Sequence, residues 1–202
     1  MDYKTIISIV SVVLVFVGYG PYILDVFKRK TTPHTFTFLV WGLASILTWG
    51  LQVHGGAGVG AWITFAVAAV CIFIFILSFK YGEKGITRSD VVFLILALIS
   101  LFLWPILDQP FWSLIIVVTT DVLGFAPTVR KSWHKPFSET LFTWEICVFR
   151  HGLSIFALEQ FNIFTLLYPI AWTAANLLFC IFLIVRRRQI KQDPKLSSYI
   201  PQ

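Results

Sequence analysis

The chain has 202 residues, of which 57% are hydrophobic and only 13% charged, and its formal net charge is +6. Soluble domains carry about a quarter charged residues and at most about half apolar ones, so these proportions exclude a soluble globular domain. The basic residues stand in short clusters between apolar runs, which favours membrane topology over nucleic-acid binding as the origin of the positive charge. The apolar runs are long enough to cross a bilayer, which takes about 20 residues per helix. The composition therefore predicts one integral membrane domain over residues 1–202.

The apolar runs, taken in chain order, predict seven transmembrane helices and thus an all-α fold. No small-residue cleavage site follows the first run, so we expect it to stay as a helix rather than be removed as a signal peptide. The three cysteines fall inside apolar runs, where they are expected to pack rather than form disulfides or a metal site. The predicted helices lie near residues 5–27, 35–53, 58–79, 91–107, 111–130, 138–157 and 163–185.

The distribution of Lys and Arg indicates how these helices are oriented. Fourteen of the sixteen lie at or after the ends of the first, third and fifth helices, or in the tail 186–202. The loops after the second, fourth and sixth helices contain none. Under the positive-inside rule the basic side is cytoplasmic. We therefore expect a multi-pass protein of the cell membrane with its N-terminus outside and its basic C-terminal tail in the cytoplasm.

An internal repeat underlies the apolar pattern. A shift of 106 positions lays Gly-Tyr-Gly-Pro at 18–21 over Gly-Phe-Ala-Pro at 124–127, and Phe-Thr-Phe at 36–38 over Phe-Thr-Trp at 142–144. A single offset without gaps covers three helices and their loops. We therefore expect repeat one at about 5–79 and repeat two at about 111–185. The linker helix, at about 91–107, restores the original direction, so the two copies are parallel (3+1+3).

Each repeat carries a proline near the inner end of its first helix, Pro21 or Pro127. Proline removes one helical hydrogen bond and crowds the carbonyl one turn back, so these helices should bend or weaken there. The bend is either a hinge for gating or a fixed kink that only shapes the bundle.

Together these features resemble the SWEET and PQ-loop (MtN3-like) transporter superfamily. The likeness lies in two parallel three-helix repeats, an inverting helix between them, an outer N-terminus and the paired prolines. The family dipeptide Pro-Gln reads Pro21-Tyr22 and Pro127-Thr128 here, and the prolines expected within the second helices are replaced by Pro33 and Pro136 at or before the helix starts. The family's cytoplasmic gate of four prolines is thus only half matched.

The resemblance also implies a central cavity lined by the third helix of each repeat. The matching residues are Tyr168, Trp172 and Asn176 in the last helix and Trp62 in the third. Side chains of these types could stack on a substrate and hydrogen-bond it. We therefore expect these four residues to form the substrate site.

Four ionisable residues stand inside predicted membrane helices of the second repeat: Asp121, Glu145, Arg150 and His151. A charge at mid-membrane costs about 2.5 kcal/mol or more, so each calls for a partner or a wet cavity. One interpretation is a structural ion pair between Asp121 and Arg150. The other is that desolvation favours the neutral form of the acid left over, which makes Asp121 or Glu145 a candidate proton carrier. His151 could shuttle protons or only pack.

The sequence thus predicts a transporter of a small polar solute (a sugar, an amino acid or a related metabolite) by alternating access, with coupling to protons through Asp121 or Glu145 left open. Its partners would be the lipid bilayer, the solute and protons, with homo-oligomerisation open. A seven-helix receptor or scaffold without transport is the alternative. No metalloprotease or nucleophile-elbow pattern is present, so we expect neither an enzyme nor a metal or cofactor.

Overall fold

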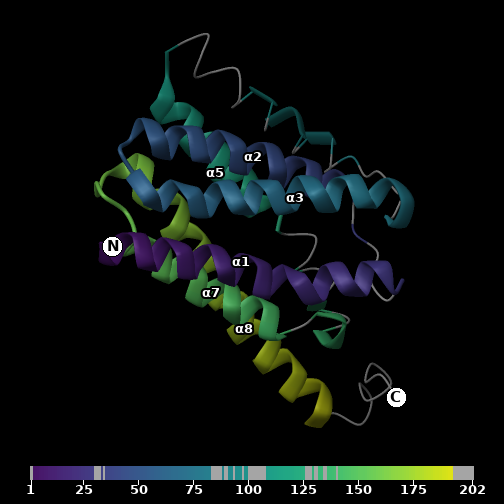
Figure 1. Cartoon of the computed structure of the whole chain (residues 1–202). Coiled ribbons are helices and arrows are strands. Elements are labelled where there is room, and N and C mark those ends of the chain that lie inside the picture. The colour runs from purple at the N-terminus through teal and green to yellow at the C-terminus, as the bar shows by residue number, and fades with distance from the viewer. Residues whose placement is uncertain are drawn as a thin grey trace.

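The computed structural model describes residues 2–29, 33, 35–82, 88, 91–92, 94–96, 98–99, 108–125, 129, 132–133, 136–139 and 141–192. Within these ranges the protein is helical and contains no strand, which confirms the predicted all-α class (Figure 1). The described part of the predicted fourth helix is helical at 91–92, 94–96 and 98–99. The main elements are α1 (Tyr3–Phe27), α2 (Thr35–His54), η1 (Gly58–Gly60), α3 (Ala61–Tyr81), α5 (Pro110–Leu123), η2 (Pro136–Ser138), α7 (Leu141–Ile155) and α8 (Ile163–Gln192).

Four helices are long and apolar enough to cross a membrane: Tyr3–Phe27, Thr35–His54, Gly58–Tyr81 and Ile163–Lys191. The predicted helices at 111–130 and 138–157 are shorter than expected, since α5 has 14 residues and α7 has 15. At 1.5 Å per residue each spans roughly 22 Å, less than the hydrocarbon core of about 30 Å. α5 ends at Leu123, followed by Gly124, whose N–H bonds to the Thr120 carbonyl, and α7 begins only after the short helix η2.

α8 is longer than predicted, because it continues to Gln192 instead of ending near residue 185. No glycine or proline occurs between residue 185 and Pro194, and arginine and lysine are good helix formers. Basic side chains are also favourable at the negative end of a helix dipole. The first seven residues of the predicted tail 186–202 are therefore part of a helix.

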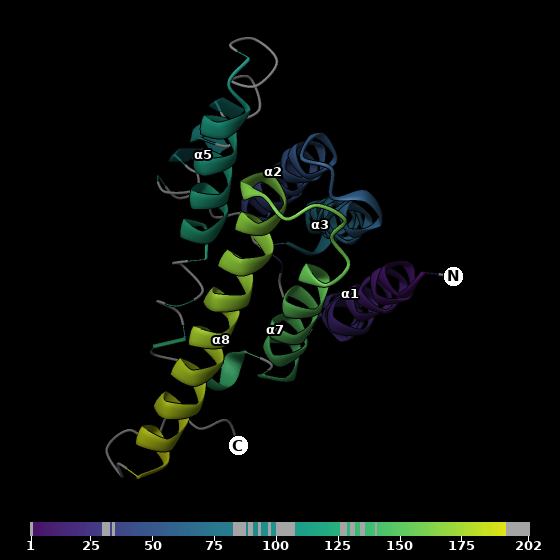
Figure 2. The ribbon, with the colours of Figure 1, turned by 90° about the vertical axis from the view of Figure 1, so that its left-hand side faces the viewer.

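The helices pack in the same order in two halves, α1 to α3 and α5 to α8. In the first half α3 packs against both α1 and α2, and in the second half α8 packs against both α5 and α7. Figure 2 shows α8 between α5 and α7. Across the halves, α1 contacts α7 and α2 contacts α5, and α2 also contacts α8. Buried side chains of α2, α5 and α8 pack together in one hydrophobic cluster.

At one end of the bundle, the α2–α3 and α7–α8 loops are hydrogen-bonded to each other. This end is called here the opposite end, because it lies opposite the basic end described next. The Asn162 Nδ2 donates to the Gly55 carbonyl at 2.6 Å, and the Glu159 N–H donates to the Ala57 carbonyl at 3.2 Å. Gly58 has a φ of +58°, and a Cβ there would collide with the Glu159 carboxylate, so only glycine fits. The two halves are therefore held together at this end.

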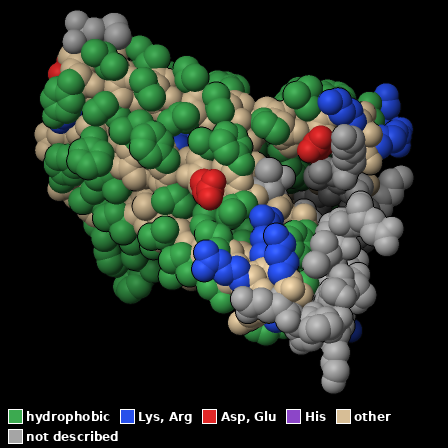
Figure 3. All heavy atoms as spheres, turned by 90° about the horizontal axis from the view of Figure 1, so that it is seen from below, with side chains coloured by type: hydrophobic (Ala, Val, Ile, Leu, Met, Phe, Trp, Pro, Cys, Tyr) green, Lys and Arg blue, Asp and Glu red, His purple; other side chains and the backbone are tan. Residues whose placement is uncertain are grey.

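The other end, called the basic end, carries Lys28 and Arg29 directly after α1, Lys80 of α3 and the basic residues of the last turns of α8. The Arg186 guanidinium lies 4.6 Å from the Trp133 ring centroid and donates to the Trp133 carbonyl. Arg187 donates to the carbonyls of Pro136 and Glu139. Figure 3 shows most of the Lys and Arg on that face gathered toward one side, beside a largely apolar surface. These Lys and Arg side chains thus lie at one end of the bundle, next to an apolar surface.

Close packing of α2 on α3 depends on Gly42, where a Cβ would lie 3.0 Å from the Ile72 Cγ1. We expect Gly42→Leu to force the helices apart and to lower the free energy of unfolding by about 1–3 kcal/mol. Gly20→Leu is the matched control, because no neighbouring atom lies within 4 Å of a Cβ there. Thermal unfolding in detergent micelles measures both. Equal stability of the two variants would contradict this packing.

Candidate functional site

The site begins at Asp121, which α5 places in the interior of the bundle. Leu114, Val117, Val118 and Asp121 are the buried residues at helical spacing, so the carboxyl shares the apolar side of its helix. Asp121 is 1% exposed. Its Oδ2 accepts a hydrogen bond of 2.9 Å from the indole N–H of Trp172 on α8. A carboxyl of the second half is therefore held by a tryptophan rather than by a cation.

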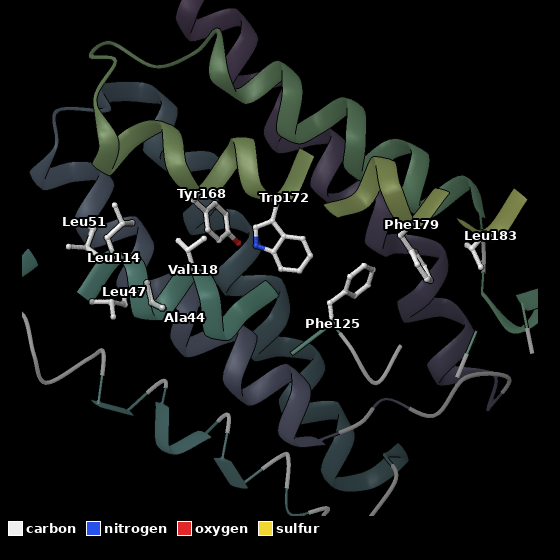
Figure 4. Packing of buried hydrophobic residues seen from close by; sticks show 11 residues of the cluster. Ala44, Leu47, Leu51, Leu114, Val118, Phe125, Tyr168, Trp172, Phe179 and Leu183 are labelled. Atoms are coloured by element: carbon white, nitrogen blue, oxygen red, sulfur yellow. The ribbon is translucent and has the colours of Figure 1, made fainter. Parts of the chain in front are cut away.

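The Trp172 indole is surrounded by four other rings. Trp41 of α2 meets it edge-on, with centroids 6.0 Å apart, and Phe125 lies at 5.8 Å. The His151 ring stacks on it at 6.0 Å with an interplanar angle of 15°, and Tyr168 lies at 6.4 Å. Figure 4 shows Tyr168, Trp172 and Phe125 converging in the space between α8 and its neighbours. These contacts fix the direction in which the indole N–H points.

Arg150 has a partner other than the predicted one. It is 2% exposed, and its Nη2 lies 2.7 Å from the Nε2 of His151. Guanidinium groups only donate, so the His151 Nε2 must accept, which places the ring proton on Nδ1 and leaves the imidazole neutral. The Asp121 carboxyl bonds to Trp172 instead. The described side chains thus form no ion pair between Asp121 and Arg150.

Two further contacts connect the site to neighbouring groups. The Tyr168 hydroxyl lies 3.4 Å from the Ser45 Oγ of α2, and either oxygen can donate. The Asn176 Nδ2 donates to the Trp172 carbonyl one turn earlier at 2.6 Å. Both Tyr168 and Asn176 are buried. The first of these contacts brings the first half of the chain into the site.

The structure therefore brings together six of the predicted site residues, and it separates two. Trp62 is 56% exposed and packs on Trp49 and Phe65. Glu145 is exposed on α7. The six residues that meet are Asp121, Arg150, His151, Tyr168, Trp172 and Asn176.

Of the two predicted hinge prolines, the structure describes only Pro21. α1 runs as one helix through Pro21, so this proline does not interrupt it. Pro127 lies outside the described residues.

Three residues at the site escaped the sequence interpretation. Trp41 and Ser45 are four positions apart in α2, a spacing that could have indicated a shared side, but tryptophan and serine are common in membrane helices. Pro169 is buried inside α8 next to Tyr168 and has no N–H to offer the carbonyl one turn back. Pro169 could have been noticed in the sequence, because a proline inside a helix, three residues before Trp172, marks a weak point of that helix.

Several polar atoms of the site are buried and have no hydrogen-bond partner. Leaving such an atom unpaired costs about 1–3 kcal/mol. Two acceptors and two donors are thus free to bind water or a solute. No group of three or more His, Cys, Asp or Glu that could hold a metal occurs among the described residues. The unpaired atoms are the Asp121 Oδ1, the Asn176 Oδ1, the Arg150 Nη1 and the Trp41 Nε1.

Comparisons with protein-family models, with curated proteins and with solved structures found no match.

The hydrogen bond between Trp172 and Asp121 can be tested by Trp172→Phe. This change leaves the Asp121 carboxyl without its buried donor, so we expect the free energy of unfolding to fall by about 1–3 kcal/mol. Trp62→Phe alters an exposed ring that packs on Trp49 and Phe65, so its effect should stay within about 0.5 kcal/mol. Both are measured by thermal unfolding in detergent. A Trp172→Phe variant as stable as the wild type would count against the bond.

Proposed function

We propose that this chain is a membrane transporter of a small polar solute and that it works by alternating access between its two halves. The observation that carries the proposal is the Asp121 carboxyl, buried where α2, α5 and α8 meet and retaining one unpaired oxygen. Ionisable groups at mid-membrane mark solute or proton pathways in many transporters. Asp121 is then the group that exchanges a proton during the cycle.

The order of the helices supports two parallel copies of one unit, as in the 3+1+3 arrangement of the SWEET and PQ-loop superfamily. The third helix of each half packs between the other two. The contacts between halves are also reciprocal: exchanging α1 with α5 and α2 with α7 converts the α1–α7 contact into the α5–α2 contact. A pseudo-two-fold axis between the halves requires this exchange.

The burial pattern supports the same repeat independently of the sequence matches. All five buried positions of α1 have a buried counterpart 106 residues later. All the buried residues of α7 except Cys147 have a buried counterpart 106 residues earlier. Equivalent positions are thus interior in both halves although their chemistry differs. The pairs in α1 are Ser8 with Leu114, Ser11 with Val117, Val15 with Asp121, Gly18 with Gly124 and Val26 with Ser132.

The free donors and acceptors support a polar substrate such as a sugar, an amino acid or a related metabolite. Asn176 offers an acceptor, Arg150 a donor and Asp121 an acceptor, next to the ring of Trp172. These groups combine the stacking and hydrogen-bonding capacity that such a solute requires. Glu145 and Trp62 belong to neither the site nor the proposed cycle, because both are exposed.

Access to the site requires the contacts between halves to part at one end at a time. At the opposite end these are the bonds between the loops at 55–60 and 159–162. Toward the basic end the interior is filled by Phe125, Trp144 and Phe179, whose centroids lie 4.8–4.9 Å apart. Pro21 and Pro127 would serve as hinges for these movements. Pro169 adds a further flexible point within one turn of Trp172.

Transport is tested in liposomes that contain the purified protein and a panel of labelled sugars, amino acids and nucleosides. We expect at least one solute to show pH-dependent flux. Asp121→Asn should bring proton-driven accumulation to the level of empty liposomes, because an amide cannot exchange the proton. Glu145→Gln is the matched control and should transport as the wild type does. Absence of flux for every solute at every pH would contradict the proposal.

The proposed orientation places the basic end in the cytoplasm. The native cysteines at 71, 147 and 180 are buried, so cysteines introduced on the surface can be labelled selectively. We expect Asp2→Cys to react with a membrane-impermeant maleimide in intact cells and Arg188→Cys to react only after permeabilisation. Both positions are exposed. The reverse pattern would invert the topology.

A further inference from the structure

One side of α2 carries a row of polar groups that leads away from the site. Trp41, Ser45, Thr48 and Gln52 are spaced by four, three and four residues, which places them on one side of a helix. This polar row faces α8, because Trp41 contacts Trp172 and Ser45 contacts Tyr168. Thr48 is 0% exposed and Gln52 is 2% exposed. The row therefore continues, inside the protein, from the site to the last turn of α2.

The hydroxyl of Thr48 is not bonded in the usual way. Serine and threonine inside helices commonly donate to a carbonyl three or four residues earlier. Thr173 does so toward the Pro169 carbonyl at 2.6 Å, and Ser154 does so toward the His151 carbonyl at 2.7 Å. The Thr48 Oγ1 has no partner, and neither has the Gln52 Oε1. These two groups are thus free to bind something that fills the interior.

Water is the ligand that fits such a row. Buried waters bind polar groups that would otherwise be unsatisfied, and each takes two to four partners. Ser113, in the first turn of α5 at the same end of the bundle, offers another unpaired buried hydroxyl. Toward the basic end, the interior is instead occupied by the rings of Phe125, Trp144 and Phe179, which offer no hydrogen-bond acceptor. The unpaired polar groups therefore favour hydration from the opposite end.

We propose that the polar row of α2 is a water-lined path by which protons reach Asp121 from the opposite end; this rests on the proposed function. Each hydroxyl or water along the path accepts one proton and passes one on, so the path itself is unchanged. The proton ends on the Oδ1 of Asp121, which is unpaired. The path fills with water when the contacts between the loops at 55–60 and 159–162 part.

The other ionisable groups around Asp121 are few. Near the carboxyl stand the Tyr168 hydroxyl of α8 and the Cys71 thiol of α3. From α7, His151 stacks on Trp172, and Arg150 lies within hydrogen-bond distance of His151. α2 carries no Asp, Glu, Lys or Arg, and its only histidine is at its last residue. The row is therefore neutral throughout, which suits the passage of a proton without trapping it.

The experiment introduces Thr48→Cys or Gln52→Cys into protein whose three native cysteines are replaced by alanine. A small charged methanethiosulfonate is added to proteoliposomes from one side at a time. A thiol must ionise in water to react, so we expect Thr48→Cys to react from the opposite end at least about tenfold faster than Thr173→Cys, the matched control with a bonded hydroxyl. Equal, slow rates at both positions would overturn the path. Faster reaction from the basic end would overturn its direction.

A second measurement covers the case in which the cysteine variants do not fold. Infrared spectra of the protonated carboxyl in D₂O give the rate of exchange at Asp121, and Asp121→Asn identifies its band. We expect Thr48→Val and Gln52→Leu to slow this exchange while Thr173→Val leaves it unchanged. Unchanged exchange in all three variants would overturn the proposal. Neither measurement depends on solute flux. If protons reach Asp121 along the path but the protein transports no solute, the proposed function is refuted and the path is not.

Discussion

The hydrogen bond between the Trp172 indole and the Asp121 carboxyl is the constraint on which the interior depends. An acidic group among apolar helices is tolerated only where a donor meets it, and here that donor comes from a different helix. The indole in turn keeps its direction because His151 stacks on it and Trp41 closes its edge. α2, α5, α7 and α8 are thus positioned around one polar contact.

Several positions that lie 106 residues apart in the chain are both buried but carry different side chains. Val15 and Ala44 are buried in the first half. The residues 106 positions later, Asp121 and Arg150, are buried in the second half. An apolar residue at such a position contributes only packing, whereas an ionisable one contributes chemistry at a cost in stability. Among the described residues, the buried Asp, Arg and His side chains all belong to the second half. The first half nevertheless supplies Ser45, Thr48 and Gln52 through the side of α2 that faces α8.

Much of the fold could be predicted from the sequence, and the site only in part. Long apolar runs specify α1, α2, α3 and α8 because a helix is the only common way to satisfy the backbone of such a run in lipid. The lengths of α5 and α7 were overestimated, since hydropathy alone does not register Gly124 or the short helix at Pro136. Glu145 was placed with Asp121 because both are acids in neighbouring helices, yet the rotation of α7 leaves it exposed.

By itself the sequence determined the helical class, the clusters of basic residues between apolar runs and the 106-residue spacing of the matching motifs, because these are properties of local composition and period. Only the tertiary structure decided which side chains meet. Trp172 and Asp121 are 51 residues apart, and Ser45 and Tyr168 are 123 apart. Their contacts depend on how each helix is rotated against helices distant in the chain. That rotation follows from packing of complete surfaces, which no single segment encodes.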